Sequence, residues 1–479
     1  MGHQQHAFGN LHGRTREGMT LLGRRGMLKA SLAGLAGLTV PDLLRHNAQV
    51  LAAGGSTPRP KSVILLWMAG GPSQIDTWDP KPLRPFNNRG PFSAIDTALP
   101  GVQICEHLPK SAQMLNKMTL IRSVDAKHSN HEPNTVFQTG NVLAEARTNP
   151  EAEKYPSIAS LIAKFKGANH PAMPPYVAFM KSRSHLAFGG YLGKQYDPFL
   201  ANLATRLPVY TDVGRDTGNV TGADLFQLPR GLSADRIEDR RGLMEEFDRF
   251  RSDLDQQGTL QAVDAYRQQA VEMVMGRRAQ TAFDITREPD DIRQKYGKHL
   301  WCQQALIARR LVEAGVTFVT LDLSYHSASG TWDTHGDNIP PYGGIKNGLG
   351  PLLPLFDHLL TTLVQDLEDH GLLDQTLVMA MGEFGRTPNM GTQDSTDGRN
   401  HWPEVMSMCL AGGGMRHGQV IGASEHDGGR ILSRPVTPPD LAATLYQYMG
   451  VPLDAAYLDA RGRPRPIVEN EGKPIAELF

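Results

Sequence analysis

A short apolar segment that ends in a polar cluster constrains this chain more than any other feature. Residues 376–381, Thr-Leu-Val-Met-Ala-Met, form a continuous apolar run, as expected of a strand covered on both faces of its sheet. The run stops at residues 382–388, Gly-Glu-Phe-Gly-Arg-Thr-Pro, and Asp-Gly-Arg-Asn-His-Trp follows at residues 397–402. Open α/β sheets bind ligands beyond the carboxyl ends of their strands. The stretch therefore predicts a metal or anion site at a strand end of an α/β sheet.

Strand-like and helical segments alternate along the rest of the chain. Apolar runs typical of strands cover residues 62–68, 118–124, 175–180, 316–321 and 405–410. Helical patterns cover residues 157–165, 291–315, 350–370 and 438–449. This alternation predicts one α/β domain with a mainly parallel sheet over residues 61–479. Residues from about 235 to 290 are charged and lack a strand pattern, so we expect a helical insertion or cap there.

Charge and cysteine content exclude some classes of partner and site. The 479 residues include 49 Lys and Arg against 50 Asp and Glu, and the formal net charge of −1 favours neither nucleic acid nor an anionic membrane. Three cysteines without a Cys-x-x-Cys pair, Cys105, Cys302 and Cys409, make neither a disulfide scaffold nor a thiolate zinc site. The 49 Gly and 33 Pro predict many turns and a loop-rich, enzyme-like surface.

The first 60 residues have the pattern of an export signal and a linker. Residues 23–29, Gly-Arg-Arg-Gly-Met-Leu-Lys, fit the twin-arginine pattern, and a mildly apolar run follows at residues 30–40. That run is too short to span the roughly 30 Å of membrane hydrocarbon as a helix. We therefore expect the twin-arginine machinery to export the chain to the periplasm or cell surface. The alternative is a chance arginine pair before an ordinary amphipathic helix.

Two polar clusters follow the first two strand-like runs. The glycine-rich turn after the first run contains Ser73, which suits a helix cap or an anion contact, and Asp76 lies three residues on. The second cluster contains His128 and His131, spaced to share one helical face, and leads to Thr135. Either cluster is suited to line a metal or phosphate site. The alternatives are a tight strand-to-helix turn capped by serine and a polar loop that caps a helix.

Two later clusters carry metal-ligating residue types. Asp333 and His335 follow the 316–321 run, and carboxylate with imidazole is the usual ligand mixture for Zn, Mn or Fe. Glu383, at the end of the 376–381 run, is a candidate ligand or general base, and His401 is a candidate ligand. Arg386 is suited to bind an anion through two parallel hydrogen bonds. The alternatives are a solvated loop around Asp333 and a Glu383–Arg386 ion pair that only fixes its loop.

In this order the clusters resemble a known family of exported bacterial proteins, domain-of-unknown-function family 1501, which is grouped with the alkaline phosphatases and sulfatases. The likeness covers the whole chain after the leader. Its matching blocks are the twin-arginine leader, Gly70-Gly71-Pro72-Ser73, Asp76-Thr77-Trp78-Asp79-Pro80-Lys81-Pro82, Asp333-Thr334-His335, Gly382-Glu383-Phe384-Gly385-Arg386-Thr387-Pro388 and His401-Trp402. The resemblance implies a three-layer α/β/α sandwich with a dinuclear metal site at the strand ends. Asp333 and His335 are similar in position to a late ligand pair, Glu383 to the acidic residue that ends the next strand, and His401 to the final histidine.

The sequence departs from the pattern of that superfamily at two places. The first strand ends in Ala-Gly-Gly at residues 69–71, where the superfamily has an aspartate, so Asp76 or Asp79 would have to replace it. The sulfatase signature, Cys or Ser followed by x-Pro-x-Arg, is absent, so formylglycine chemistry is not expected. Ser73 or Thr135 is then the nucleophile, or a metal-activated water attacks directly.

The sequence thus predicts an exported, metal-dependent hydrolase of phosphate or sulfate esters, small-molecule or polysaccharide. One or two divalent ions, Zn, Mn, Fe or Ca, are expected. The proposed ligands are Asp76, His131, Asp333, His335, Glu383 and His401, and the proposed catalytic residues are Ser73, Thr135 and Arg386. The alternatives are a superfamily member that binds a ligand or exported partner without turnover and a structural surface protein.

Overall fold

The computed structural model describes most of the chain as two compact units, Met1–Arg59 and Pro60–Phe479. In the first unit it describes two short strands, β1 (Arg14–Arg16) and β2 (Met19–Leu21), which pair antiparallel. In the second unit it describes residues 60–129, 135–201, 277–325, 331–336, 342–392 and 394–479. The predicted twin-arginine segment and most of the predicted insertion at 235–290 lie outside the described residues.

The second unit is built on an eight-stranded sheet in the order β14-β6-β13-β10-β3-β9-β7-β8. Its strands are β3 (Ser62–Trp67), β6 (Met118–Val124), β7 (Tyr176–Phe179), β8 (Phe199–Leu200), β9 (Phe318–Asp322), β10 (Thr376–Met381), β13 (Met406–Gly412) and β14 (Gln419–Ile421). Neighbouring strands run parallel except at β13, which is antiparallel to both β6 and β10. The predicted, mostly parallel sheet is confirmed.

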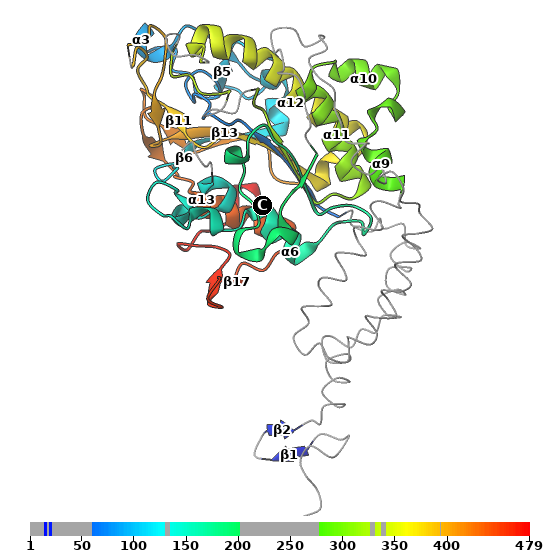
Figure 1. The fold of residues 1–479 in the computed structure, drawn as a ribbon. Coiled ribbons are helices and arrows are strands. Elements are labelled where there is room, and N and C mark those ends of the chain that lie inside the picture. Colours follow the sequence, from blue (N-terminus) through cyan, green and yellow to red (C-terminus); the bar gives the residue numbers. More distant parts are fainter. Residues whose placement is uncertain are drawn as a thin grey trace, which may run out of the picture. The chain divides into compact units, whose positions relative to one another are not determined.

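Helices cover both faces of this sheet and complete a three-layer α/β/α sandwich (Figure 1). One face carries α4 (Pro109–Met114), α9 (Arg277–Phe283), α10 (Asp290–Tyr296), α11 (Leu300–Ala314) and α12 (Gly350–Asp369). The other carries α5 (Val136–Thr139), α6 (Ile158–Lys166) and α13 (Pro438–Met449). Alternate side chains of β3 enter the two cores, Ile64 and Leu66 on one side and Val63 and Leu65 on the other. Strands buried on both faces have no polar side, which explains their continuous apolar runs.

Local signals in the sequence fix where the helices begin and end. Thr437 caps α13 and forms a capping box with Asp440, so two backbone N–H groups are satisfied reciprocally. Gly315 ends α11 with a φ of 110°, a conformation that side chains with a Cβ rarely adopt. The predicted helix at 291–315 is two helices, because Gly297, with a φ of 89°, ends α10 three residues before α11 begins.

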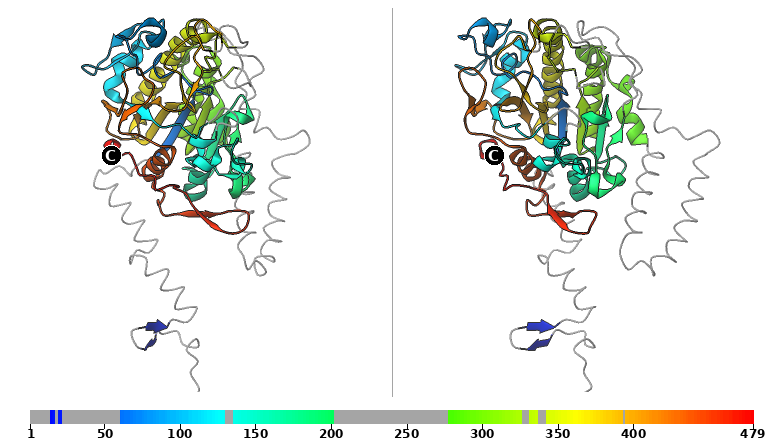
Figure 2. Two further views of the ribbon diagram at one scale, coloured as in Figure 1. Left: turned by 90° about the vertical axis from the view of Figure 1, so that its left-hand side faces the viewer. Right: turned by 60° about the vertical axis from the view of Figure 1, so that its left-hand side comes forward.

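Smaller elements surround the sandwich. A short helix, α3 (Phe86–Arg89), and a π-helical turn at Gly344–Leu349 lie in its loops. Two-stranded sheets pair β4 (Ala94–Asp96) with β5 (Gln103–Cys105), β11 (Gly385–Arg386) with β12 (His401–Trp402), β15 (Ala423–Ser424) with β16 (Ile431–Ser433), and β17 (Ala456–Leu458) with β18 (Pro464–Pro466). Figure 2 shows the β17–β18 hairpin extending from the side of the sandwich that carries α13. Within the described part of the chain, no helix combines the length and apolar character needed to cross a membrane.

Candidate metal centre at the strand ends

Three adjacent parallel strands end level with one another and send their loops to the same edge of the sheet. Trp67, the last residue of β3, lies opposite Asp322 of β9 and Met381 of β10. Backbone hydrogen bonds continue past the strand ends, from the Met68 N–H to the Met381 carbonyl at 2.8 Å and from the Trp332 N–H to the Ala69 carbonyl at 3.0 Å. The loops with the predicted clusters therefore meet at the edge where open α/β sheets bind ligands.

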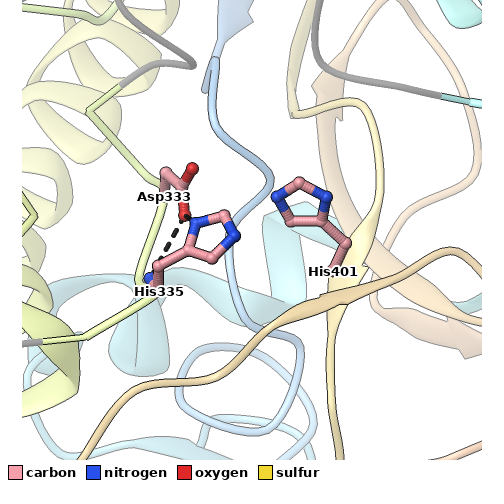
Figure 3. A group of neighbouring side chains, drawn as sticks. All are labelled: Asp333, His335 and His401. Carbon is pink, nitrogen blue, oxygen red and sulfur yellow. Dashed lines mark hydrogen bonds and ion pairs between the residues drawn. The ribbon is translucent and has the colours of Figure 1, made fainter. Parts of the chain in front are cut away.

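Asp333, His335 and His401 converge at this edge (Figure 3). One ligating atom of each lies within 4.8 Å of those of the other two. A ring nitrogen of His335, Nδ1, is hydrogen-bonded to Asp333 Oδ1, and the other nitrogen faces His401. The two imidazole rings lie 4.4 Å apart, centroid to centroid, at 70°. The Asp333 side chain is fully buried, whereas that of His335 is 14% exposed and His401 is partly buried.

A short hairpin places His401 in this cluster. Strand β12 pairs antiparallel with β11, and their register sets His401 opposite Arg386. The predicted stretch 376–402 thus folds back on itself, so that both of its polar clusters reach one place. The Trp402 side chain anchors the hairpin, because its Nε1–H donates to the Gly429 carbonyl at 2.5 Å.

Arg386 is held by protein groups on all sides. Its Nη1 lies 2.8 Å from Asp333 Oδ1, and both side chains are fully buried. Its Nε–H donates to the Gly71 carbonyl at 2.9 Å, its Nη2 to the Gly70 carbonyl, and Nη1 also to the Arg399 carbonyl at 3.2 Å. The anion-binding role predicted for Arg386 stays a prediction, and it requires the guanidinium to exchange some of these partners.

Glu383 is fully buried and binds the backbone of the first strand end. Its Oε1 accepts a hydrogen bond from the Gly70 N–H at 2.8 Å. Gly70 has a φ of 115°, and a Cβ there would lie 2.3 Å from the backbone nitrogen of Asp333. Glycine is required at this position because neighbouring loops lie against its backbone. Glu383 is not one of the three converging residues, and its predicted role as a ligand stays a prediction.

Asp76 and Ser73 belong to a separate buried cluster. Asp76 Oδ2 lies 2.6 Å from Arg399 Nε, with both side chains fully buried, and accepts a hydrogen bond from the Ser73 hydroxyl at 2.5 Å. Asp79, the other carboxylate considered for the first strand end, lies 2.9 Å from Lys81 Nζ. The structure gives both carboxylates a cationic side chain as partner, and it leaves the Ser73 hydroxyl donating to Asp76.

The second polar cluster is only partly described. Thr135 is buried, and its hydroxyl donates to the Ala144 carbonyl at 2.5 Å. It lines a cavity of about 300 Å³ together with Tyr155 and Arg183. His131 lies outside the described residues, so its predicted role as a ligand stays a prediction.

One buried aspartate–histidine pair at the same edge was not predicted from the sequence. Asp322, the last residue of β9, lies with its Oδ2 2.8 Å from Nδ1 of His185, and both side chains are fully buried. The Lys181 N–H donates to the same oxygen at 2.8 Å. The strand-end position of Asp322 is a signal that was available in the sequence. His185 lies in a segment without a recognisable pattern, so only the fold reveals it.

Comparisons with known proteins confirm the predicted family. The crystal structure of the PsFucS1 sulfatase from Pseudoalteromonas sp. aligns with 13% identity and a TM-score of 0.36, over 90% of this chain and 73% of that one. That of the phosphonate monoester hydrolase of Agrobacterium radiobacter aligns with 12% identity and a TM-score of 0.33, over 87% of this chain and 77% of that one. Both similarities are distant, and no curated protein sequence matches the chain. A family model does match, from residue 60 to residue 479, and the chain therefore belongs to the family described as "Protein of unknown function (DUF1501)".

Proposed function

We propose that this chain is a metal-dependent hydrolase of phosphate or sulfate esters, with Asp333, His335 and His401 holding a divalent ion. The convergence of these three side chains, from two loops far apart in the sequence, is the observation that carries the proposal. A carboxylate and two imidazoles are a common ligand set of catalytic sites that keep positions open for substrate. Two imidazoles favour Zn, Mn or Fe over Ca, which takes oxygen ligands.

The spacing of the three side chains fits an ion after a small adjustment. Their ligating atoms lie within 4.8 Å of one another. Two donors at about 2.1 Å from a tetrahedral ion lie about 3.4 Å apart, so the widest pair needs to close by about 1.4 Å. The two histidines have unequal freedom to do so, because His335 is already oriented by its bond to Asp333.

The roles of the protein groups follow from their contacts. A divalent ion at this place would polarise an ester oxygen and lower the pKa of a water molecule. Arg386 holds Asp333 through its 2.8 Å ion pair. The partly exposed side of His335 is where a small-molecule or polysaccharide ester would approach. Ser73 and Thr135 donate to buried acceptors, so water is the nucleophile that this proposal requires.

The test combines metal analysis with hydrolysis assays. Purified protein is analysed for Zn, Mn, Fe and Ca, and hydrolysis of aryl phosphate and aryl sulfate esters is measured before and after chelation. His401→Ala should remove both the metal and the activity. His417→Ala is the matched control, because His417 contacts Thr119 at the start of β6, at the opposite edge of the sheet. Intact, folded protein without metal and without activity would refute the proposal.

A second function, ligand binding without turnover, is favoured by one observation. The hydroxyls of Ser73 and Thr135 and the guanidinium of Arg386 are all engaged by protein groups. A metal centre without a protein nucleophile is also what a binding protein would have. Calorimetric titration with inorganic phosphate and sulfate separates the two functions: a binding protein takes up an anion in the presence of metal yet leaves the aryl esters intact.

We also propose that the chain acts in the periplasm or at the cell surface after twin-arginine export. The support is the Arg24-Arg25 pair and the apolar run that follows it. Replacement of both arginines by lysine should retain the protein in the cytoplasm, as measured by cell fractionation. Unchanged export of that variant would contradict the proposal.

A further inference from the structure

The guanidinium of Arg386 lies in a cage of oxygen atoms beside the proposed metal site. The cage consists of the carbonyl oxygens of Gly70, Gly71 and Arg399 and the carboxylate oxygen Oδ1 of Asp333. The guanidinium is fully buried within it. Backbone carbonyls and carboxylates are also the oxygen ligands that hard divalent cations take. The cage therefore has the chemistry of a cation site, and a side chain of the protein fills it.

Close packing of neighbouring loops requires glycine at two positions of the cage. Neither Gly70 nor Gly71 has a side chain, and a Cβ on either would lie within 3 Å of atoms of neighbouring loops. The guanidinium of an arginine carries a positive charge. It lies on the same Asp333 oxygen that bonds His335. Asp333 thus contacts a fixed cation and, at the same time, belongs to the cluster proposed to bind a metal.

We infer that Arg386 takes the place of a second metal ion, so that the centre holds one ion and a built-in guanidinium. The inference rests on the proposed function, because it presupposes the metal bound by Asp333, His335 and His401. The sequence predicts one or two ions per chain, and the inference is that the number is one. A second ion in the cage would be repelled by the buried guanidinium and would need the oxygens that the guanidinium occupies.

The stoichiometry of metal binding tests the inference without an activity assay. The full chain is stripped with a chelator and titrated with Mn²⁺, the bound ions are counted by equilibrium dialysis, and electron paramagnetic resonance is recorded. We expect one ion per chain and an uncoupled Mn²⁺ spectrum. Two ions at the roughly 3.5–4 Å spacing of dinuclear centres would give an exchange-coupled spectrum instead.

Substitutions at Arg386 extend the test. Arg386→Ala vacates the cage and removes the repulsion, so a second Mn²⁺ should bind, whereas Arg386→Lys keeps the charge and should still bind one. Arg309→Ala is the matched control, because Arg309 is an equally buried, ion-paired arginine that contacts Asp366 on α12. The Arg309→Ala variant should bind one Mn²⁺ per chain, as the wild type does. If Arg386→Ala does not fold, Arg386→Gln, which is neutral and keeps an amide donor, takes its place.

Each outcome has a distinct meaning. One ion in the wild type and two in the neutral Arg386 variant would support the inference. Two coupled ions in the wild type, or a single ion in a folded neutral variant, would overturn it and leave the proposed function standing. A wild type that binds no ion would remove the metal centre itself, and the proposed function would fail together with the inference.

Discussion

Asp76 and Asp333 are suited to a paired test, because they are similar in burial and in their arginine partner but differ in their proposed role. Each is a fully buried aspartate in an ion pair with a fully buried arginine, Asp76 with Arg399 at 2.6 Å and Asp333 with Arg386 at 2.8 Å. The sequence proposed both as metal ligands, and the structure brings one of them to His335 and His401. We predict that Asp76→Ala lowers the stability of the protein and leaves its metal content unchanged.

The magnitude follows from what the substitution leaves behind. Removing one partner of a buried ion pair costs roughly 3–5 kcal/mol, because the remaining charge is uncompensated. The lower half of that range is expected, since Arg399 keeps hydrogen bonds to the carbonyls of Asn88 and Pro388, both at 2.7 Å. For a domain of about 400 residues, the expected loss of about 3–4 kcal/mol corresponds to a decrease in melting temperature of about 3–5 °C.

The assay measures stability and metal content on the same samples. Urea unfolding gives the free energy of unfolding, and elemental analysis gives the metal per chain. Asp333→Ala should lose a similar amount of stability by stranding Arg386 and should also lose the metal. The double variant Asp76→Ala with Arg399→Met removes the stranded charge and should recover part of the loss. If Asp76→Ala binds no metal and unfolds like the wild type, Asp76 is a ligand and the assignment is wrong.

Three further predictions concern the site and one surface ion pair. His401→Ala should weaken metal binding by more than the roughly 10–100-fold typical of an outer-shell partner, as measured by competition with a chelating dye; an unchanged affinity would exclude His401 as a ligand. Gly70→Ala should destabilise the protein by about 2–5 kcal/mol in urea unfolding, because its Cβ would lie 2.3 Å from the Asp333 nitrogen at a φ of 115°; full stability would contradict the close approach. Arg434 lowers the pKa of Glu477 from 4.5 to about 2, so the pair should stabilise the fold fully above about pH 4.5 and lose that contribution as the pH falls toward 2. Glu477→Gln should therefore flatten the acid unfolding curve in that window, and an unaltered curve would show that the pair contributes nothing.

Much of the fold was predictable because its signals are local. The strands at residues 62–67 and 376–381 are apolar throughout because helices cover both faces of the sheet, and that requirement is visible in each segment alone. Gly315 and the Thr437–Asp440 capping box mark helix ends through local backbone conformation and hydrogen bonding. The pattern did not reveal that β13 runs antiparallel to its neighbours, because strand direction depends on the path of the connecting loops.

The candidate site was also predictable only in part. By itself, the sequence determined that carboxylates, histidines and arginines follow the strand ends, and Asp333, His335 and His401 were three of the six ligands that it proposed. Only the tertiary structure decided which charge each carboxylate meets, because a buried carboxylate is satisfied by a metal ion or by a guanidinium, and the choice depends on the loop that lies opposite. The hairpin that sets Arg386 opposite His401 brings both to Asp333, while Asp76 is paired with Arg399. Partners that are far apart in the sequence leave no local pattern, and the packing of the loops at the sheet edge is what selects them.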